Sequence, residues 1–236
     1  DHPNVSVRAM DLTDGDSVER AVADTLAAHG RIDAVIQNAG SLFLGVTEAF
    51  TVEQLQRQMD VNLTGAFRVA RAVLPSMRAR ESGLLVHVSS AFGRVAVPFN
   101  GLYCASKFAL EGMVEAMHHE LRPFGIDCVL VEPGPFATAV GASAVAPDDT
   151  ARLKEYARLD PMGARLGATF GRIFSTQPAE TDPVHVARAF SEIIALPAGK
   201  RPLRTLVGLD TGVHKLNAAH EAVMRSTLKA LDLEAP

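Results

Sequence analysis

The sequence has no tryptophan and contains only two cysteines and two tyrosines among 236 residues. Cys104 and Cys128 show no C-x-x-C spacing, and Cys128 lies in an apolar run typical of a strand. We therefore expect a buried free thiol at Cys128 rather than a disulfide. The eight histidines show no H-E-x-x-H or similar ligand spacing. The adjacent His118 and His119 would point about 100° apart on a helix, so we expect no metal site.

Long apolar runs and an excess of positive charge are also missing. No run approaches the roughly 20 residues that span a bilayer, and no signal peptide opens the chain. The net charge is −4, without the basic stripe that binds nucleic acid. A hydrophobic content of 47% is enough for a sizeable core. These features predict a cytoplasmic protein with a single domain over residues 1–236, no nucleic-acid partner and no membrane span.

Strand and helix signals alternate along the chain. Runs typical of strands occur at 5–10, 32–36, 84–88, 126–131 and 203–207. Helical patterns occupy 16–28, a long segment from residue 51, 102–121, 183–195 and the tail from about residue 213. Thr51 and Gln54 form a capping box that starts the long helix. This alternation predicts an α/β fold with a doubly wound parallel sheet covered on both faces.

The stretch 136–181 is patterned irregularly and contains several glycines and prolines. Parallel sheets bind ligands beyond the carboxyl ends of their strands, and long connections there often act as lids. We therefore predict a substrate-binding loop with a mobile lid at 136–181, completed by segments 41–45 and 91–101. Apolar side chains in these segments favour an apolar alcohol or ketone. Core packing or subunit contacts would account for half of them equally well.

Ser90, Tyr103 and Lys107 are the most informative group of residues. A tyrosine and a lysine four positions apart lie on one face of a helix. The ammonium stabilises a phenolate, so we expect Lys107 to lower the pKa of Tyr103 from about 10 toward neutrality. Ser90, at the end of the preceding strand, would hold the same substrate oxygen. This set predicts reduction of a carbonyl, or oxidation of an alcohol, beside a hydride carrier.

Other polar motifs follow the ends of predicted strands. Asp11-Leu12-Thr13 alone suits a helix cap, whereas Asn38-Ala39-Gly40 and Pro133-Gly134-Pro135 suit plain turns. Asn62 interrupts the long helix, where Asn and the nearby Gly65 are poor helix formers. It marks either a solvated polar position or a helix opened locally so that a carbonyl holds water.

Taken in order, these motifs resemble the short-chain dehydrogenase/reductase family. The run from Pro98 to Gly112 is similar to the branch that holds hydroxysteroid and retinol dehydrogenases. The resemblance implies a Rossmann-like, three-layer α/β/α fold and an oxidoreductase that uses NADP or NAD on a small alcohol or carbonyl substrate. The matching positions are Asp11, Asn38, Ala39, Gly40, Asn62, Ser90, Tyr103, Lys107, Pro133, Gly134 and Thr138.

The resemblance also implies a role for each of these residues. Tyr103 would be the general acid/base, Ser90 would position the substrate oxygen, and Lys107 would lower the pKa of Tyr103 and bind the nicotinamide ribose. Asn62 would hold a water that links Lys107 to solvent. The other cofactor-binding residues would be Asp11 and Leu12 at the adenine, Asn38, Ala39 and Gly40 beside the adenosine ribose, and Pro133, Gly134 and Thr138 around the nicotinamide.

The sequence departs from the family pattern at its start. The glycine-rich T-G-x-x-x-G-x-G turn does not occur in it, and about 50 residues are missing by comparison with a first βαβ unit. We therefore expect an N-terminally truncated part of a longer domain. A non-catalytic, cofactor-sensing or protein-binding member of the same fold is the alternative function.

The family resemblance further implies a homodimer or homotetramer. The long helix from Thr51 and the helix that carries Tyr103 would form its interface. Apolar side chains on the second helix would supply contact area there, and packing in the core explains them equally well. These side chains are Met113, Val114, Met117 and Leu121.

Overall fold

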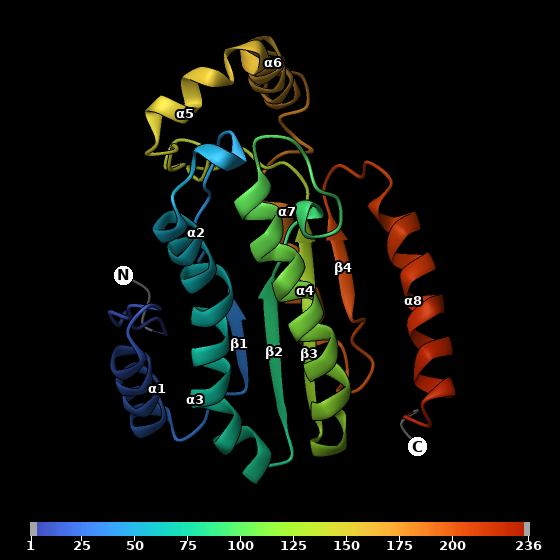
Figure 1. The fold of residues 1–236 in the computed structure, drawn as a ribbon. Helices are drawn as coiled ribbons and strands as arrows, with labels where there is room; N and C mark the ends of the chain where they lie inside the picture. The colour runs from blue at the N-terminus through green and yellow to red at the C-terminus, as the bar shows by residue number, and fades with distance from the viewer. Residues whose placement is uncertain (1–3, 234–236) are drawn as a thin grey trace.

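The computed structural model describes residues 4–233, and a parallel sheet lies at its centre (Figure 1). Its four strands are adjacent in chain order, and every neighbouring pair is parallel. The strands are β1 (Ala34–Gln37), β2 (Gly83–Val88), β3 (Ile126–Pro133) and β4 (Arg204–Val207). The predicted parallel α/β sheet is confirmed.

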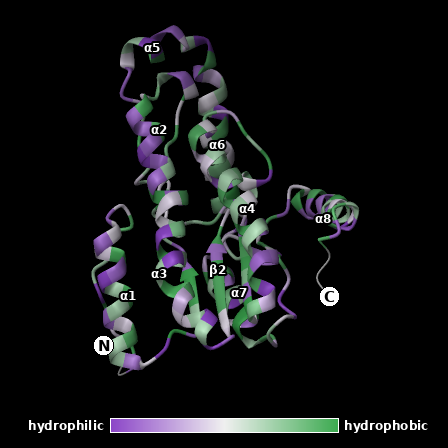
Figure 2. Cartoon of the chain, turned by 60° about the horizontal axis from the view of Figure 1, so that its bottom comes forward, coloured by the Kyte–Doolittle hydropathy of each residue, from purple (hydrophilic) through white to green (hydrophobic). Residues whose placement is uncertain are grey.

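Helices cover both faces of the sheet, because successive residues of a strand point to opposite sides. On one side α1 (Gly15–His29), α3 (Gly65–Ala79) and α4 (Gly101–Leu121) share a core with Leu85 of β2. On the other side α7 (Val184–Ala195) packs on Val86. Helix α2 (Val52–Met59) leads toward α3, and α8 (Val213–Ala230) follows β4. Figure 2 shows the strands as a hydrophobic layer between helices of mixed hydropathy.

The apolar side chains of α4 belong to the core of this chain. Val114, Met117 and Leu121 are buried in the cluster shared with α3, and Met113 packs against it. Their interpretation as subunit contacts is therefore wrong, and core packing explains them. Both cysteines are free and buried, as predicted for Cys128.

The strand predicted at 5–10 does not form. This segment has no regular structure, and the side chain of Val7 is 93% exposed. A strand needs a neighbour whose backbone groups pair with its own. Within residues 4–233 no strand is paired with this segment. An apolar pattern alone therefore indicated extended chain here but not sheet.

The region 136–181 is largely helical, whereas its pattern predicted irregular structure. It contains α5 (Thr150–Glu155) and α6 (Asp160–Thr176), which lie beyond the carboxyl ends of the strands (Figure 1). Neither helix has a fully buried residue. Phe170 of α6 contacts the ring of Phe92 edge-on at 6.5 Å between centroids. Among residues 4–233, no helix is long and apolar enough to cross a membrane.

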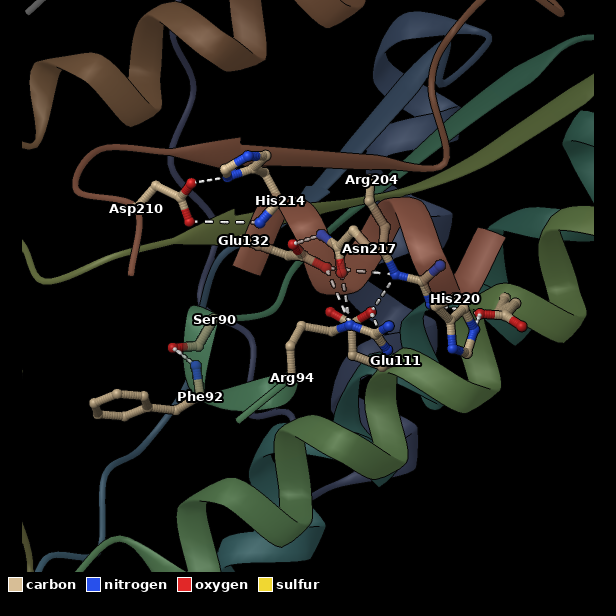
Figure 3. A network of polar contacts seen from close by, with 11 residues as sticks. Ser90, Phe92, Arg94, Glu111, Glu132, Arg204, Asp210, His214, Asn217 and His220 are labelled. Carbon is tan, nitrogen blue, oxygen red and sulfur yellow. Dashed lines mark hydrogen bonds and ion pairs between the residues drawn. The ribbon is translucent and has the colours of Figure 1, made fainter. Parts of the chain in front are cut away.

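A buried charge cluster joins α4, β3, β4, α8 and the turn after Ser90 (Figure 3). Arg204 donates hydrogen bonds to Glu111 at 2.8 Å and to Glu115 at 2.5 Å. Arg94 lies 3.9 Å from carboxylate oxygens of both Glu111 and Glu132. The members of the buried charge cluster are Arg94, Glu111, Glu115, Glu132, Arg204, Asn217 and His220.

Two glycines with left-handed backbone allow a matched test of this architecture. Gly125, before β3, has φ +66°, and a Cβ there would lie 2.2 Å from the Glu81 carbonyl oxygen. Gly30 ends α1 with φ +76° in open space. We expect G30A to cost about 1 kcal/mol from backbone strain and G125A about 2–4 kcal/mol because of the added clash. Urea unfolding measures both, and equal losses would contradict the placement of Gly125.

Glu132 gives a second test, through pH. Burial, with Glu111 nearby, raises the pKa of Glu132 from 4.5 to about 7. An acid with a raised folded pKa contributes stability that is present below pH 4.5 and lost as the pH rises to about 7. Between those values we expect the wild type to lose about 2–3 kcal/mol more stability than Glu132→Gln. Unfolding at several pH values measures this, with exposed Glu120→Gln as control; parallel curves for wild type and E132Q would exclude it.

Candidate active site

Nine of the residues predicted from the sequence line a single cleft of about 660 Å³ at the carboxyl ends of the strands. They are Asn38, Ala39, Gly40, Ser90, Tyr103, Lys107, Pro133, Gly134 and Thr138. An adjoining cavity of about 90 Å³ is lined by Leu12 and Asn62, together with Asn38, Ala39 and Lys107. Asp11 lines neither space. The sheet therefore brings together segments that are up to 100 positions apart in the sequence.

Ser90 and Tyr103 meet because β2 ends where α4 begins. Ser90 caps the 3₁₀ turn Ala91–Gly93, and its Oγ accepts a hydrogen bond from the Phe92 backbone N–H at 3.1 Å (Figure 3). Tyr103 lies in the first turn of α4, close enough to Ser90 for the serine to lower the pKa of its hydroxyl. Two hydroxyls from different elements thus face one side of the cleft.

Lys107 lies one turn further along α4 and is only 5% exposed. Its Nζ donates a hydrogen bond to the Val88 carbonyl oxygen at 2.8 Å and lies 5.7 Å from the ring centroid of Tyr103. Burial lowers the pKa of Lys107 from 10.5 to about 8, and the charge of Glu111 acts in the opposite direction. The ammonium is therefore held at the base of the cleft close to its point of titration.

The pKa of Tyr103 differs from the sequence prediction. Burial raises this pKa above its ordinary value of 10, while the hydrogen bond with Ser90 lowers it to a smaller extent. Lys107 is bonded to Val88 and lies beside the tyrosine ring, so its charge does not overcome the loss of water around the hydroxyl. The expected shift toward neutrality is thus wrong for the chain alone.

Asn62 lies in a π-helical turn, Asp60–Thr64, between α2 and α3. It is 3% exposed, so it is not a solvated polar position, and the helix is locally opened, as the other interpretation required. Its Oδ1 accepts from the Ser41 N–H at 2.8 Å, and its Nδ2 donates to the Ser41 carbonyl and to Ser106 Oγ, both at 3.0 Å. The amide is used to join the loop after Gly40 to α4.

Asp11 and Leu12 have structural contacts of their own. Asp11 is exposed and accepts hydrogen bonds from the N–H and hydroxyl of Thr13, at 2.8 and 2.7 Å, which lower its pKa. It does not cap α1, because Asp14 does so. The Leu12 carbonyl accepts from Arg68 at 2.9 Å. Their role at an adenine remains a prediction.

The sequence analysis missed two groups of residues around the cleft. Helix α7 and the proline before it contribute lining side chains, because α7 covers the second face of the sheet; these are Pro183, Val186, Ala187 and Phe190. Gln54 and Gln58 are buried on α2 and bond the loops at 146 and 41–43. The apolar period predicted the helix α7, but the sequence does not indicate which face of the sheet this helix covers.

The residues of the cleft fit the nicotinamide end of a dinucleotide. A lysine ammonium has three donors, and among residues 4–233 a single hydrogen bond of Lys107, to Val88, is formed. Two donors are thus left for the hydroxyls of a ribose. Gly134 lies so close to Leu209 that a Cβ would be 2.7 Å from its carbonyl oxygen, and a Cβ on Gly40 would be 3.3 Å from Asn62 Oδ1. Side chains at either position would press against neighbouring protein and displace the turns that border the cleft.

Comparisons with known proteins agree with this geometry. Human 17-beta-hydroxysteroid dehydrogenase type 1 is 40% identical over 137 residues, which is 58% of this chain and 42% of that protein. A short-chain dehydrogenase structure from Streptomyces avermitilis has a TM-score of 0.70 and 29% identity, and covers 95% of this chain and 77% of its own. A gluconate 5-dehydrogenase from Burkholderia cenocepacia, in complex with NADP and tartrate, has a TM-score of 0.55 and 31% identity over 60% of this chain and 55% of its own.

The matches cover the chain and its relatives to different extents. The chain spans about half the length, or less, of the first curated relatives it matches. The profile described as short chain dehydrogenase matches residues 2–149, which contain Asn62, Ser90, Tyr103 and Lys107. The resemblance seen in the sequence is therefore confirmed: the chain belongs to the short chain dehydrogenase family.

Proposed function

We propose that the protein is an NAD(P)-dependent oxidoreductase that interconverts an alcohol and a ketone or aldehyde. The observation that carries this proposal is the meeting of Ser90, Tyr103 and Lys107 at one side of a cleft. The related gluconate 5-dehydrogenase, whose structure is a complex with NADP, supports the cofactor class.

The chain's own residues supply proton transfer and orientation. A nicotinamide cofactor supplies the hydride when bound. As hydride reaches a carbonyl carbon, negative charge builds on the oxygen, and hydroxyl donors that are already in place stabilise it by roughly 3 kcal/mol each. Ser90 would hold this oxygen, and Tyr103 would give it a proton. The reverse reaction would return the proton to Tyr103.

Lys107 and Asn62 would support the proton transfer. The ammonium of Lys107 favours the phenolate that Tyr103 becomes after it gives up its proton. Because the Asn62 side-chain amide is used by Ser41 and Ser106, a water that links Lys107 to solvent would be held by the Asn62 backbone carbonyl. The π-helical turn is the local opening that such a carbonyl needs.

The far side of the cleft favours an apolar substrate. Phe136, Val140, Val186 and Phe190 line it, and they offer contact area rather than hydrogen bonds. The relative named as a hydroxysteroid dehydrogenase supports the same choice. We also propose that 136–181 forms a substrate-binding lid region of one domain, with α5 and α6 over the cleft.

Assembly and compartment remain proposals as well. Once Val114 and its neighbours are assigned to the core, the outward face of α4 still presents Phe108, Ala105 and Gly112 to solvent. We propose that this face and α3 form a homodimer interface in a cytoplasmic protein. The residues described would supply the nicotinamide end of a cofactor site.

The two tyrosines offer a matched test of catalysis. Tyr103→Phe removes the proton donor, whereas Tyr156 is half-buried, does not line the cleft and donates its hydroxyl to Glu48. We expect Y103F to lose more than about 100-fold in kcat with its fold intact. Y156F, in the proposed lid, keeps its proton donor and is expected to change KM rather than kcat. Oxidation of NADPH or NADH by apolar ketones measures both, with circular dichroism as a fold check. Full turnover by Y103F would refute the mechanism, and cofactor binding without any turnover by the wild type would support the non-catalytic alternative.

The adjacent serines test which hydroxyl holds the substrate oxygen. Ser90 lines the cleft and lowers the pKa of Tyr103, whereas Ser89 Oγ is buried without a hydrogen-bond partner among the described residues. We expect Ser90→Ala to lower kcat by about 100-fold, as for loss of one oxyanion donor, and Ser89→Ala to lower it far less. Steady-state kinetics decide between them, and the opposite order would reassign the role to Ser89.

A further inference from the structure

Glu111 lies one helical turn beyond Lys107, on the same buried face of α4. The two side chains are 2% and 5% exposed, respectively. The turn that carries Gly93 is seated on both, because a Cβ on Gly93 would lie 3.2 Å from Lys107 Cβ and 3.3 Å from Glu111 Cγ. Both side chains are thus shielded from bulk water, and a carboxylate at Glu111 acts on the ammonium with less screening than at the surface.

The buried charge cluster fixes Glu111 beside the helical turn that carries Lys107. Arg204 Nε donates to Glu111 at 2.8 Å, and Arg94 lies 3.9 Å away. The cluster holds three carboxylates, Glu111, Glu115 and Glu132, against two guanidinium groups and the imidazole of His220 on Glu115. Once Glu132 is ionised, above about pH 7, the carboxylates outnumber the guanidinium groups. Because buried charges require compensation, an ammonium one turn from Glu111 is then favoured.

We propose that Glu111 is a positioning residue for the reaction, whose carboxylate keeps Lys107 protonated beside Tyr103 and so sets the alkaline limit of activity. This proposal rests on the proposed function only for its effect on turnover. The effect on Lys107 itself is a property of the fold and is measured without substrate or cofactor.

The surroundings of Lys107 contain no other carboxylate that acts on it among the described residues. Burial is the larger influence and lowers its pKa to about 8, and Glu111 is the group that raises it. His87, on β2, is fully buried, and its own pKa is lowered to about 4 by burial and by Lys107, so it is neutral near pH 7. The ammonium also lies near the Tyr103 ring, the Val88 carbonyl and Gly40, none of which is a carboxylate.

Other charges act on Glu111 from each element packed against it. Arg94 reaches it from the turn after Ser90, Arg204 from β4, and Glu132 from β3. Glu115, one turn further along α4, is bonded by both Arg204 and His220 of α8. Glu115 thus shares the arginine of Glu111 but lies two turns from Lys107, which makes it the matched control.

The decisive experiment is the titration of Lys107 in wild type, Glu111→Gln and Glu115→Gln by NMR of ¹³Cε-labelled lysine. The Lys107 signal is identified by its loss in Lys107→Arg, since the other four lysines are exposed. The amide of E111Q still accepts from Arg204 but carries no charge. We expect the pKa of Lys107 to fall by about one unit in E111Q and to stay within about 0.3 unit of wild type in E115Q.

Turnover provides the second measurement. In E111Q the loss of kcat/KM at alkaline pH is expected to begin at a lower pH, displaced by the same amount as the pKa of Lys107. In E115Q this loss is expected at the same pH as in the wild type. An unchanged Lys107 titration in E111Q, or an equal shift in E115Q, would overturn the proposal. If E111Q fails to fold, Glu111→Asp and Glu115→Asp replace the two glutamine variants. The pKa of Lys107 is then expected to fall in E111D, by less than in E111Q, and to stay unchanged in E115D. If wild type shows no turnover, the proposed function fails while the NMR titration still decides the role of Glu111.

Discussion

The burial of one ammonium group constrains the half of this fold that carries the proposed catalytic residues. Lys107 is surrounded by protein, and a buried cation is stable only where dipoles and opposite charges replace its water. The Val88 carbonyl is free to accept because β2 ends there, and Glu111 is near because helical geometry places it one turn away. The lysine therefore requires a helix laid across a strand end. That same crossing brings Ser90, which follows the strand, against Tyr103 of the helix.

The buried charge cluster extends this requirement to the rest of the site. Arg94 lies four residues after Ser90, Glu111 four after Lys107, and Glu132 directly before Pro133 and the lining residue Gly134. Ionic contacts among these three side chains tie the segments that carry the predicted catalytic and nicotinamide residues to each other. Asn217 adds α8, since it donates to Glu132 and accepts from Arg94. A cluster that mainly fixes geometry is consistent with the modest stability that buried ion pairs contribute.

Local pattern was enough to predict most of the fold from the sequence. The parallel strands, α1, α4 and the capped start of α2 follow from apolar period and from Thr51 and Gln54, because these signals depend on neighbours in the chain. The prediction of a strand at 5–10 was wrong because strand pairing depends on a partner far along the sequence. The prediction of a lowered Tyr103 pKa was wrong for a similar reason. The i,i+4 spacing indicates that Lys107 is near, but it does not reveal the burial that raises this pKa. The residues of α7 that line the cleft, and the charge cluster around Glu111, could be identified only from the tertiary structure.

The proposed catalytic residues and the helices beyond the strands are fixed to different degrees, and this division suits the proposed reaction. Ser90, Tyr103 and Lys107 lie on elements with many buried residues, where a shift of the hydroxyls would misplace the proton. Beyond the strands, α5 and α6 have no buried residue, and Phe170 and Phe174 stack on each other at 6.1 Å between centroids. Apolar contact there tolerates rearrangement better than a hydrogen-bonded proton donor does. Such a fold can keep one hydride and proton chemistry while its outer helices change the substrate that it accepts.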